Sequence, residues 1–389
     1  MEALGLEKWI EIDVDAVINN LYQVQDRLGE RQVKLIAVIK ADAYGHGAVP
    51  VARCLSREGV EFFAVSFLEE ALELRRAGIQ ADILLLTPLI SPHQFSAAIA
   101  NHITVTVTSF LEYEMIDRIT AETGHSLTMH LKTDTGLGRF GLNLDEILEI
   151  CRLASRNAFI YIEGIYTHMA EAAFNPAYTH KQFRQFEEIT AAISSRGFDI
   201  PCKHCANSAV VLNYPKMYLN AVRVGTLLSG QHPAGKFQTR LKLKDPFIFK
   251  TRIISLRNME EGDYLGYNRT HRLKKPARIA VIPVGFEDGL ALDVVNKPAG
   301  PVDMLKHVTK TVLRYFNADR FTITVKIRGR EYPVRGKVFM QMALVELPPH
   351  LDIAVGEEVE VPVRKVLVPR NISRVYTQKQ KLLPGGQEP

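Results

Sequence analysis

Residues 1–230 alternate short β-branched runs with longer stretches of helical periodicity, and this alternation restricts the fold more than any other feature of the chain. Strands separated by helical crossovers imply a parallel sheet. Eight such units predict an α/β fold of the (β/α)8 barrel type. We expect the strands at Lys34–Ile39, Phe62–Val65, Ile83–Leu86, Ile103–Val107, Leu127–Leu131, Ile160–Ile165, His204–Ala206 and Val222–Val224.

The stretches between these runs carry the spacing of amphipathic helices. Asp15–Leu28 is the clearest, because its apolar residues Val17, Leu21, Val24 and Leu28 fall on one helical face. Leu144–Leu153 and Tyr178–Ile193 read similarly. One helix precedes the first barrel strand, so the N-terminal segment has no obvious place in the barrel. We expect residues 1–13 to pack with a second domain.

The second domain has a different pattern, in which apolar and polar residues alternate between short turns, as in antiparallel strands. We therefore expect a barrel over residues 14–238 and a mainly β domain over residues 239–389. Val302–Phe316 has helical spacing instead. The expected strands are Phe249–Leu256, Arg278–Val284, Phe321–Ile327, Tyr332–Leu347 and Glu358–Val363.

The overall composition is that of an ordinary globular protein, with 48 Lys and Arg against 43 Asp and Glu in 389 residues. No apolar run approaches the roughly 18 residues of a membrane span. The first residues also lack the features of a signal peptide, so we expect a cytoplasmic protein with no membrane partner. Basic residues gather in Lys236–Arg278, which is typical of a solvated face or, less often, of binding to nucleic acid.

Cysteines are few, and one pair, Cys202 and Cys205, has the C-x-x-C spacing. A structural zinc site needs a second pair of ligands, and Cys54 and Cys151 are isolated. We expect small buried side chains here and no metal.

Polar side chains follow several of the predicted strands, where a barrel has its active-site mouth. They are Lys40 after the first strand, Lys132 and Asp134 after the fifth, His168 after the sixth, Asn207 and Ser208 after the seventh, and Arg223 at the eighth, which Gly225 follows. Lys40 either extends past the rim to solvent or is a desolvated amine that can form a Schiff base.

Glycines in Tyr44-Gly45-His46-Gly47 and Val224-Gly225-Thr226 leave backbone N–H groups open to a phosphate. A lysine beside phosphate-binding loops suggests pyridoxal phosphate.

Nine segments in order give this chain a close resemblance to the alanine racemase family. They are Trp9–Asp13, Ala37–Gly47, His130–Gly136, Gly164–His168, Ala206–Ala209, Val222–Gly225, Gly266–Thr270, Ile282–Gly285 and Gly336–Val338. Each segment alone is a weak signal, but together they span both expected domains. The resemblance implies a racemase that interconverts L- and D-alanine with pyridoxal phosphate and supplies D-alanine for the cell wall.

The resemblance also assigns the two bases that racemisation needs, one on each face of the substrate. Lys40 matches the lysine that binds the cofactor and acts on one face. Tyr267 matches the opposite base and is expected from the partner subunit of a homodimer with shared active sites. A phenol needs neighbouring positive charge to act as a base near neutral pH, and the family's source is expected to be Arg223 with His168. Without the family, Tyr267 reads as an ordinary loop aromatic.

Further matches concern the cofactor and the substrate. Arg223 matches the donor to the pyridine nitrogen; the alternative is a structural arginine paired with a carboxylate. Tyr44, Ser208 and Gly225 match phosphate contacts, with Asn207 and Thr226 beside them, although Asn207-Ser208 also reads as a helix N-cap. Arg139 and Met340 match residues near the substrate carboxylate. Lys132 matches a lysine that is often carbamylated; from composition alone, Lys132 and Asp134 read as a solvated pair at the rim.

The chain departs from the family pattern at several positions, and these leave the substrate open. Phe286 replaces a common tyrosine, Gln341 replaces a common aspartate, and Arg370 stands where a phosphate-binding tyrosine is common. Residues 296–320 resemble an insertion. The alternatives are a racemase of serine, lysine or several amino acids, a related barrel decarboxylase, a non-enzymatic pyridoxal-phosphate-binding regulator, and a nucleic-acid-binding protein. We expect a racemase of alanine and no nucleic-acid partner.

Overall fold

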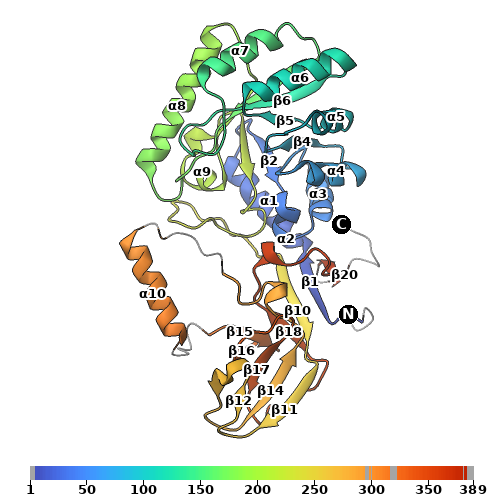
Figure 1. Ribbon diagram of the computed structural model, residues 1–389, viewed down its shortest axis with the longest axis vertical. Coiled ribbons are helices and arrows are strands. Elements are labelled where there is room, and N and C mark those ends of the chain that lie inside the picture. The colour runs from blue at the N-terminus through green and yellow to red at the C-terminus, as the bar shows by residue number, and fades with distance from the viewer. Residues whose placement is uncertain (1–4, 294–297, 299, 316–321, 380, 383–389) are drawn as a thin grey trace. The chain divides into compact units, whose positions relative to one another are not determined.

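The computed structural model describes residues 5–293, 298, 300–315, 322–379 and 381–382 (Figure 1). The chain divides into two compact units. The barrel unit comprises Asp13–Pro246 and Gln378–Pro389, and the β unit comprises Met1–Ile12 and Phe247–Thr377.

Parallel strands form the centre of the barrel unit. They make two four-stranded sheets, in the orders β4-β3-β2-β9 and β5-β6-β7-β8. Parallel bridges from Leu84 to Thr104 and from Ala206 to Val222 join the two sheets, so the strands close on themselves. The predicted (β/α)8 barrel is thereby confirmed. Its strands are β2 Lys34–Val38, β3 Phe62–Val65, β4 Asp82–Leu85, β5 Val105–Val107, β6 Leu127–Lys132, β7 Ile160–Tyr166, β8 Cys202–His204 and β9 Ala221–Val224.

Helices surround these strands (Figure 1). The first illustrates why: Asp13 caps its N-terminus by accepting from the Ala16 amide at 3.1 Å, and Gly29 ends it at a φ of 65°. Its predicted apolar face, including Leu21 and Val24, is buried. The barrel-unit helices are α1 Val14–Leu28, α2 Lys40–Gly45, α3 Ala48–Arg57, α4 Leu68–Arg76, α5 Pro92–Ala100, α6 Phe110–Thr123, α7 Leu144–Ala154, α8 Pro176–Ser195 and α9 Ser208–Asn213.

The β unit is built on an antiparallel sheet in which the order β11-β14-β17-β16-β15-β18-β10-β1-β19 brings the N-terminal strand beside β10. Ile10 and Ile12 of β1 join Phe249 of β10 in its hydrophobic core. The elements are β1 Lys8–Asp13, β10 Phe247–Arg252, β11 Ser255–Met259, β12 Tyr264–Leu265, β13 His271–Arg272, β14 Ala277–Ile282, α10 Pro301–Tyr315, β15 Thr324–Ile327, β16 Arg330–Arg335, β17 Ala343–Leu347, β18 Glu358–Val361 and β19 Arg374–Gln378; a short β20, Lys381–Leu382, follows.

Three strand predictions were wrong in detail. The seventh barrel strand ends at His204, and Ala206 makes only an isolated bridge. Phe249–Leu256 is split because β10 pairs with β1 and β18, whereas β11 pairs with β14. Tyr332–Leu347 is split by a loop that starts at Gly336, whose φ of 72° lies in the left-handed region that favours glycine.

Two predicted element ends, Phe316 and Phe321, lie outside the described residues. Cys202 and Cys205 are buried, and burial raises their pKa values to about 11 and about 12, so both thiols stay protonated. Among the residues described, no helix combines the length and the apolar character that a membrane span requires.

Candidate active site

A pocket of about 310 Å³ opens among the residues that follow the barrel strands. Every predicted cofactor-binding residue lines it, together with Arg139. These residues come from distant parts of the sequence, and they meet because the carboxyl ends of barrel strands share one face. The lining residues predicted from the sequence are Lys40, Tyr44, Arg139, His168, Asn207, Ser208, Arg223, Gly225 and Thr226.

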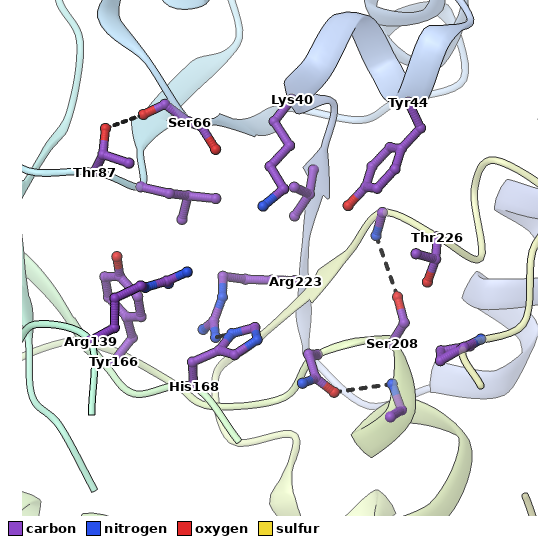
Figure 2. Close-up of a pocket in the computed structure, with 16 residues that line it drawn as sticks. Lys40, Tyr44, Ser66, Thr87, Arg139, Tyr166, His168, Ser208, Arg223 and Thr226 are labelled. Carbon is purple, nitrogen blue, oxygen red and sulfur yellow. Dashed lines mark hydrogen bonds between the residues drawn. The ribbon is translucent and has the colours of Figure 1, made fainter. Parts of the chain in front are cut away.

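Lys40 stands immediately before an unusual turn of the backbone. Ala41, Asp42, Ala43 and Tyr44 all have φ between 51° and 58° and form a left-handed turn. Such a conformation costs non-glycine residues roughly 1–2 kcal/mol each, so the surrounding contacts must hold it. Since the turn separates Lys40 from Tyr44, it fixes how both side chains enter the pocket (Figure 2).

Glu70 is one of the residues that hold this turn. Its Oε1 accepts a hydrogen bond from the Ala41 amide at 2.6 Å, and its Oε2 accepts from the amides of Ser66 and Phe67. Burial and then the charge of Arg139 lower the pKa of Lys40, while Glu70 opposes them. The Lys40 amine is therefore easier to deprotonate than a surface lysine. Of the two interpretations of Lys40, this favours a reactive, desolvated amine over a side chain that extends past the rim to solvent.

Three hydroxyl groups converge on one side of the pocket, from Tyr44, Ser208 and Thr226 (Figure 2). The Gly225 amide lies beside them, 3.5 Å from Ser208 Oγ. We call these four groups the hydroxyl cluster. Burial raises the pKa of Tyr44 to about 12, so its phenol remains a donor at neutral pH. Asn207 is the N-cap of α9, accepting from the amides of Ala209 and Val210, so the alternative N-cap interpretation also holds.

Arg223 crosses the floor of the pocket and is buried. Its Nη1 lies 2.6 Å from His204 Nδ1, and its Nη2 donates to Thr167 O at 2.7 Å. Nη2 also lies 3.3 Å from His168 Nδ1. Within the described residues, its Nε has no hydrogen-bond acceptor. These partners orient the guanidinium, and none of them is a carboxylate. The Nε–H remains available to a ligand.

His168 does not supply the positive charge that we expected from it. Burial, followed by the charges of Arg223 and Arg139, lowers the pKa of His168 to about 3. The imidazole is therefore neutral near pH 7. Arginine only donates, so Nδ1 accepts from Arg223 and the proton of His168 is on Nε2. Of the expected pair, Arg223 alone carries the charge.

Asp134 and Lys132 are not the solvated pair that composition suggested. Asp134 accepts from the amides of Gly136, Leu137 and Gly138 and so shapes the loop that leads to Arg139. Burial opposes the shift, but these three N–H groups and Lys132 lower the pKa of Asp134.

Lys132 is 1% exposed, and its amine lies 3.3 Å from Thr133 O. Burial, then the charge of Arg223, lowers its pKa to about 8. About a tenth of the amine is then uncharged at pH 7, far more than for an ordinary lysine, and this is the form that reacts with electrophiles.

Tyr267 and Met340 belong to the β unit. Their loops are neighbours, since the Tyr267 ring contacts the Phe339 ring edge-on with centroids 5.1 Å apart. Both side chains nevertheless face solvent, with exposed fractions of 69% for Tyr267 and 60% for Met340. The unit thus presents a phenol and a methionine together on its surface.

Several pocket residues were missed from the sequence. Ser66 and Thr87 line the pocket, and the Thr87 hydroxyl donates to Ser66 O. Both follow predicted strands, so the rule that was applied to the other strand ends would have found them. Tyr166, whose ring lies against the Arg223 guanidinium, directly follows the predicted strand Ile160–Ile165, so the same rule would have found it too.

Family models match both units of the chain. The model described as "Alanine racemase, N-terminal domain" matches residues 12–233, and "Alanine racemase, C-terminal domain" matches residues 247–373. The chain belongs to the alanine racemase family. It is accordingly an enzyme, an isomerase of that family.

Curated relatives agree with the alanine racemase assignment. The chain is 33% identical over 368 residues to an alanine racemase of Desulforamulus reducens, covering 92% of each protein. It is 32% identical over 345 residues to alanine racemase 1 of Oceanobacillus iheyensis, covering 88% of this chain and 84% of the relative.

Solved structures of alanine racemases share the fold. The enzyme of Clostridium difficile 630 matches with a TM-score of 0.83 and 29% identity over 97% of each chain. The enzyme of Bacillus anthracis with bound L-Ala-P matches with a TM-score of 0.81 and 26% identity, over 97% of this chain and 96% of that one.

The pocket fits pyridoxal phosphate, the cofactor associated with this family. Thr226 Oγ1 is buried without a hydrogen-bond partner in the described structure, a costly arrangement unless a ligand satisfies it. A Cβ at Gly225 would collide with the Tyr44 ring at 2.8 Å, so glycine lets the backbone N–H approach the same place. The hydroxyl cluster suits a phosphate, and the Lys40 amine suits an aldehyde.

Proposed function

We propose that this chain racemises alanine, interconverting the L and D forms, with pyridoxal phosphate held in the barrel-unit pocket. The observation that carries the proposal is that one pocket combines the Lys40 amine, whose pKa is lowered, with the guanidinium of Arg223. Membership of the alanine racemase family supports the same activity.

The proposed cofactor contacts divide the pocket residues into three groups. Lys40 Nζ would bind the aldehyde carbon. The hydroxyl cluster would bind the phosphate, with Asn207 holding the start of α9 in place. The Nε–H of Arg223 would donate to the pyridine nitrogen. When bound, pyridoxal phosphate withdraws electrons from the substrate and makes the Cα proton removable.

Arg223 supports racemisation over decarboxylation. A guanidinium keeps its proton, so Arg223 would donate a hydrogen bond to the pyridine nitrogen without protonating it. Arg223 would thereby limit how strongly the ring withdraws electrons, which would favour return of a proton to Cα over side reactions. A related decarboxylase would be expected to have a carboxylate at this position.

Two bases are needed, because inversion requires a proton to leave one face of Cα and return on the other. Lys40 is the proposed base on one face, since its lowered pKa makes the amine easier to deprotonate than an ordinary lysine. Tyr267 of a second copy is the proposed base on the other face. The exposure of Tyr267 beside Met340 on neighbouring loops supports a homodimer in which each copy completes the other's site.

Arg139 is proposed to bind the substrate carboxylate, with Met340 of the second copy nearby. Lys132 is proposed to be carbamylated. Its amine would attack carbon dioxide and release a proton, and the resulting anion would lie near the positive charges of Arg139 and Arg223 that now lower its pKa. The new charge would then hold the Arg139 guanidinium in place.

Serine, lysine or several amino acids are the alternative substrates, because the residues at the expected entrance differ from the family pattern. Phe286 brings no hydroxyl there, and the Gln341 amide donates to Glu287 Oε2 at 2.7 Å. We nevertheless propose alanine, and with it a cytoplasmic role in supplying D-alanine for peptidoglycan. Rescue of a bacterium that needs added D-alanine would test that role.

A panel of L-amino acids, incubated with the holoenzyme in deuterium oxide, tests the activity and the substrate together. We expect alanine to give the fastest formation of the D-enantiomer, with deuterium at Cα. Faster turnover of serine or lysine would replace alanine as substrate. Release of carbon dioxide would indicate a decarboxylase, and absence of exchange at Cα would indicate a non-enzymatic binding protein.

A further inference from the structure

A chain of three hydrogen bonds leads from Arg223 through His204 and His130 to Glu163, three residues to which the proposed function gives no role. Arg223 Nη1 lies 2.6 Å from His204 Nδ1, and His204 Nε2 lies 2.9 Å from His130 Nδ1. His130 Nε2 then lies 3.0 Å from Glu163 Oε2. The four residues come from the adjacent strands β9, β8, β6 and β7.

The hydrogens in this chain can be assigned from the chemistry of its two ends. Arginine has only donors, so His204 Nδ1 must accept, and the proton of a neutral His204 is on Nε2. That proton is donated to His130 Nδ1, which leaves the proton of His130 on Nε2. An ionised Glu163 only accepts. Each of the three bonds therefore points toward Glu163, and one tautomer of each histidine satisfies all of them.

Burial keeps both histidines neutral. His130 and His204 are each 0% exposed. Desolvation and then the charge of Arg223 lower the pKa of His204. Desolvation also lowers the pKa of His130, against the opposing hydrogen bond and charge of Glu163. The hydrogen bond from His130 lowers the pKa of Glu163 against the opposing effect of its own burial. A positive charge at one end and a negative charge at the other are thus connected through neutral rings.

The backbone is shaped to bring Glu163 to His130. Met129 pairs with Ile162 and His130 pairs with Gly164, so Glu163 is the extra residue of a bulge in β7. Bulges are rare between parallel strands, and they re-aim side chains near active sites. Gly164 provides the space, because a Cβ there would lie 2.6 Å from the His130 ring.

We propose that Glu163 is a positioning residue, which acts through His130 and His204 to fix the orientation of Arg223 in the pocket. The proposal rests on the proposed function, in which Arg223 faces the pyridine nitrogen. Without a terminal acceptor, His130 can move its proton to Nδ1. His204 must then accept at Nε2 and carry its proton on Nδ1, where it opposes the Arg223 donor. The guanidinium would lose one of the bonds that orient it.

Nitrogen-15 NMR of the histidine-labelled holoenzyme tests the assignment directly, because protonated and bare ring nitrogens have very different shifts. His130→Gln and His204→Gln assign the signals. In the unaltered enzyme we expect both histidines to be neutral with the proton on Nε2. A proton on Nδ1 of either ring, or on both nitrogens, would overturn the proposal without any variant of Glu163.

Two variants of Glu163 separate positioning from mere support of the fold. Glu163→Gln keeps an acceptor oxygen and should retain the tautomers, whereas Glu163→Leu removes the acceptor and should shift the proton of His204 to Nδ1. A purely structural role would lower the melting temperature of Glu163→Leu and leave the tautomer of His204 unchanged, which would contradict us. Should Glu163→Leu not fold, Glu163→Met serves as the second variant that lacks the acceptor.

Kinetics add a second readout. For Glu163→Leu we expect kcat for L-alanine to fall by about 10- to 100-fold, a loss comparable to that caused by removing a residue that orients a metal-binding histidine. KM should change by less than about twofold, because substrate binding is not altered. Glu163→Gln should restore most of kcat, and Glu149→Leu on the surface of α7 is the matched control. Equal kcat values for Glu163→Leu and Glu163→Gln would argue against the proposal.

The two hypotheses fail in different ways. If the unaltered enzyme does not racemise any amino acid, the proposed function is wrong, whatever the histidine tautomers are. If the unaltered enzyme racemises alanine but the histidine tautomers are the same in Glu163→Leu as in the unaltered enzyme, only the proposed role of Glu163 is wrong.

Discussion

Gly225 and Tyr44 lie so close together that a Cβ atom at Gly225 would overlap the phenol, at 2.8 Å from its ring carbons. One contact thus joins the loop after β9 to the left-handed turn after β2. It brings a backbone N–H and a hydroxyl donor to the same part of the pocket.

We therefore expect Gly225→Ala to weaken the binding of pyridoxal phosphate. Displacing Tyr44 should cost about 1–3 kcal/mol, which corresponds to about 5- to 150-fold in Kd. Titration of the apoenzyme with the cofactor, followed by its absorbance, measures this change. Gly300→Ala is the control, because a Cβ there meets nothing within 4 Å. An unchanged Kd for Gly225→Ala would remove the hydroxyl cluster as the phosphate site.

Lys132 makes the stability of the apoenzyme depend on pH. Its pKa is about 8 in the folded chain and 10.5 in the reference state, so between these values the unfolded state binds more protons. The contribution of Lys132 to stability therefore rises as pH increases through this window. Below pH 8 the buried charge costs about 3 kcal/mol.

Lys132→Met should accordingly be more stable than the unaltered chain at pH 7, and this advantage should disappear as pH approaches 10.5. The free energy of unfolding in buffer free of carbon dioxide measures the difference, with the exposed Lys181→Met as control. Added bicarbonate should stabilise the unaltered chain near pH 8 but not Lys132→Met. Parallel stability curves, with no response to bicarbonate, would contradict both the low pKa and the carbamate.

Asp134 should affect substrate binding through the loop that it organises. Asp134→Ala removes acceptors for three backbone amides and should cost about 1–3 kcal/mol of stability. Because Arg139 follows this loop, KM for alanine should rise while cofactor affinity remains. Steady-state kinetics and cofactor titration separate the two effects, with the surface variant Glu188→Ala as control. A normal KM would mean that Arg139 does not depend on Asp134.

The barrel could be predicted from the sequence because the spacing of apolar residues indicates which side chains are buried. The residues of α1 and of the strands that this spacing marks are buried in the structure. Strand ends were less certain. Tyr332–Leu347 keeps an apolar pattern across the loop at Gly336. The sequence pattern therefore does not show where β16 ends and β17 begins.

The candidate site was predictable where one residue follows one strand, as for Lys40 and His168. It was not predictable where function depends on a distant neighbour. The charge state of His168 depends on Arg223 and Arg139, and the bulge at Glu163 depends on how β6 and β7 pair. Neither relationship follows from spacing along the chain.

We propose that Lys40 and Tyr267 act at one site but come from different copies of the chain. Lys40→Ala and Tyr267→Phe, each purified alone, should be nearly inactive. Co-expressed with two different affinity tags and purified through both, they should give a dimer with one intact site and one doubly altered site. Racemisation of L-alanine by that dimer should recover about half of the unaltered activity, because a two-fold dimer has two equivalent sites. A mixed dimer as inactive as its parents would contradict the account.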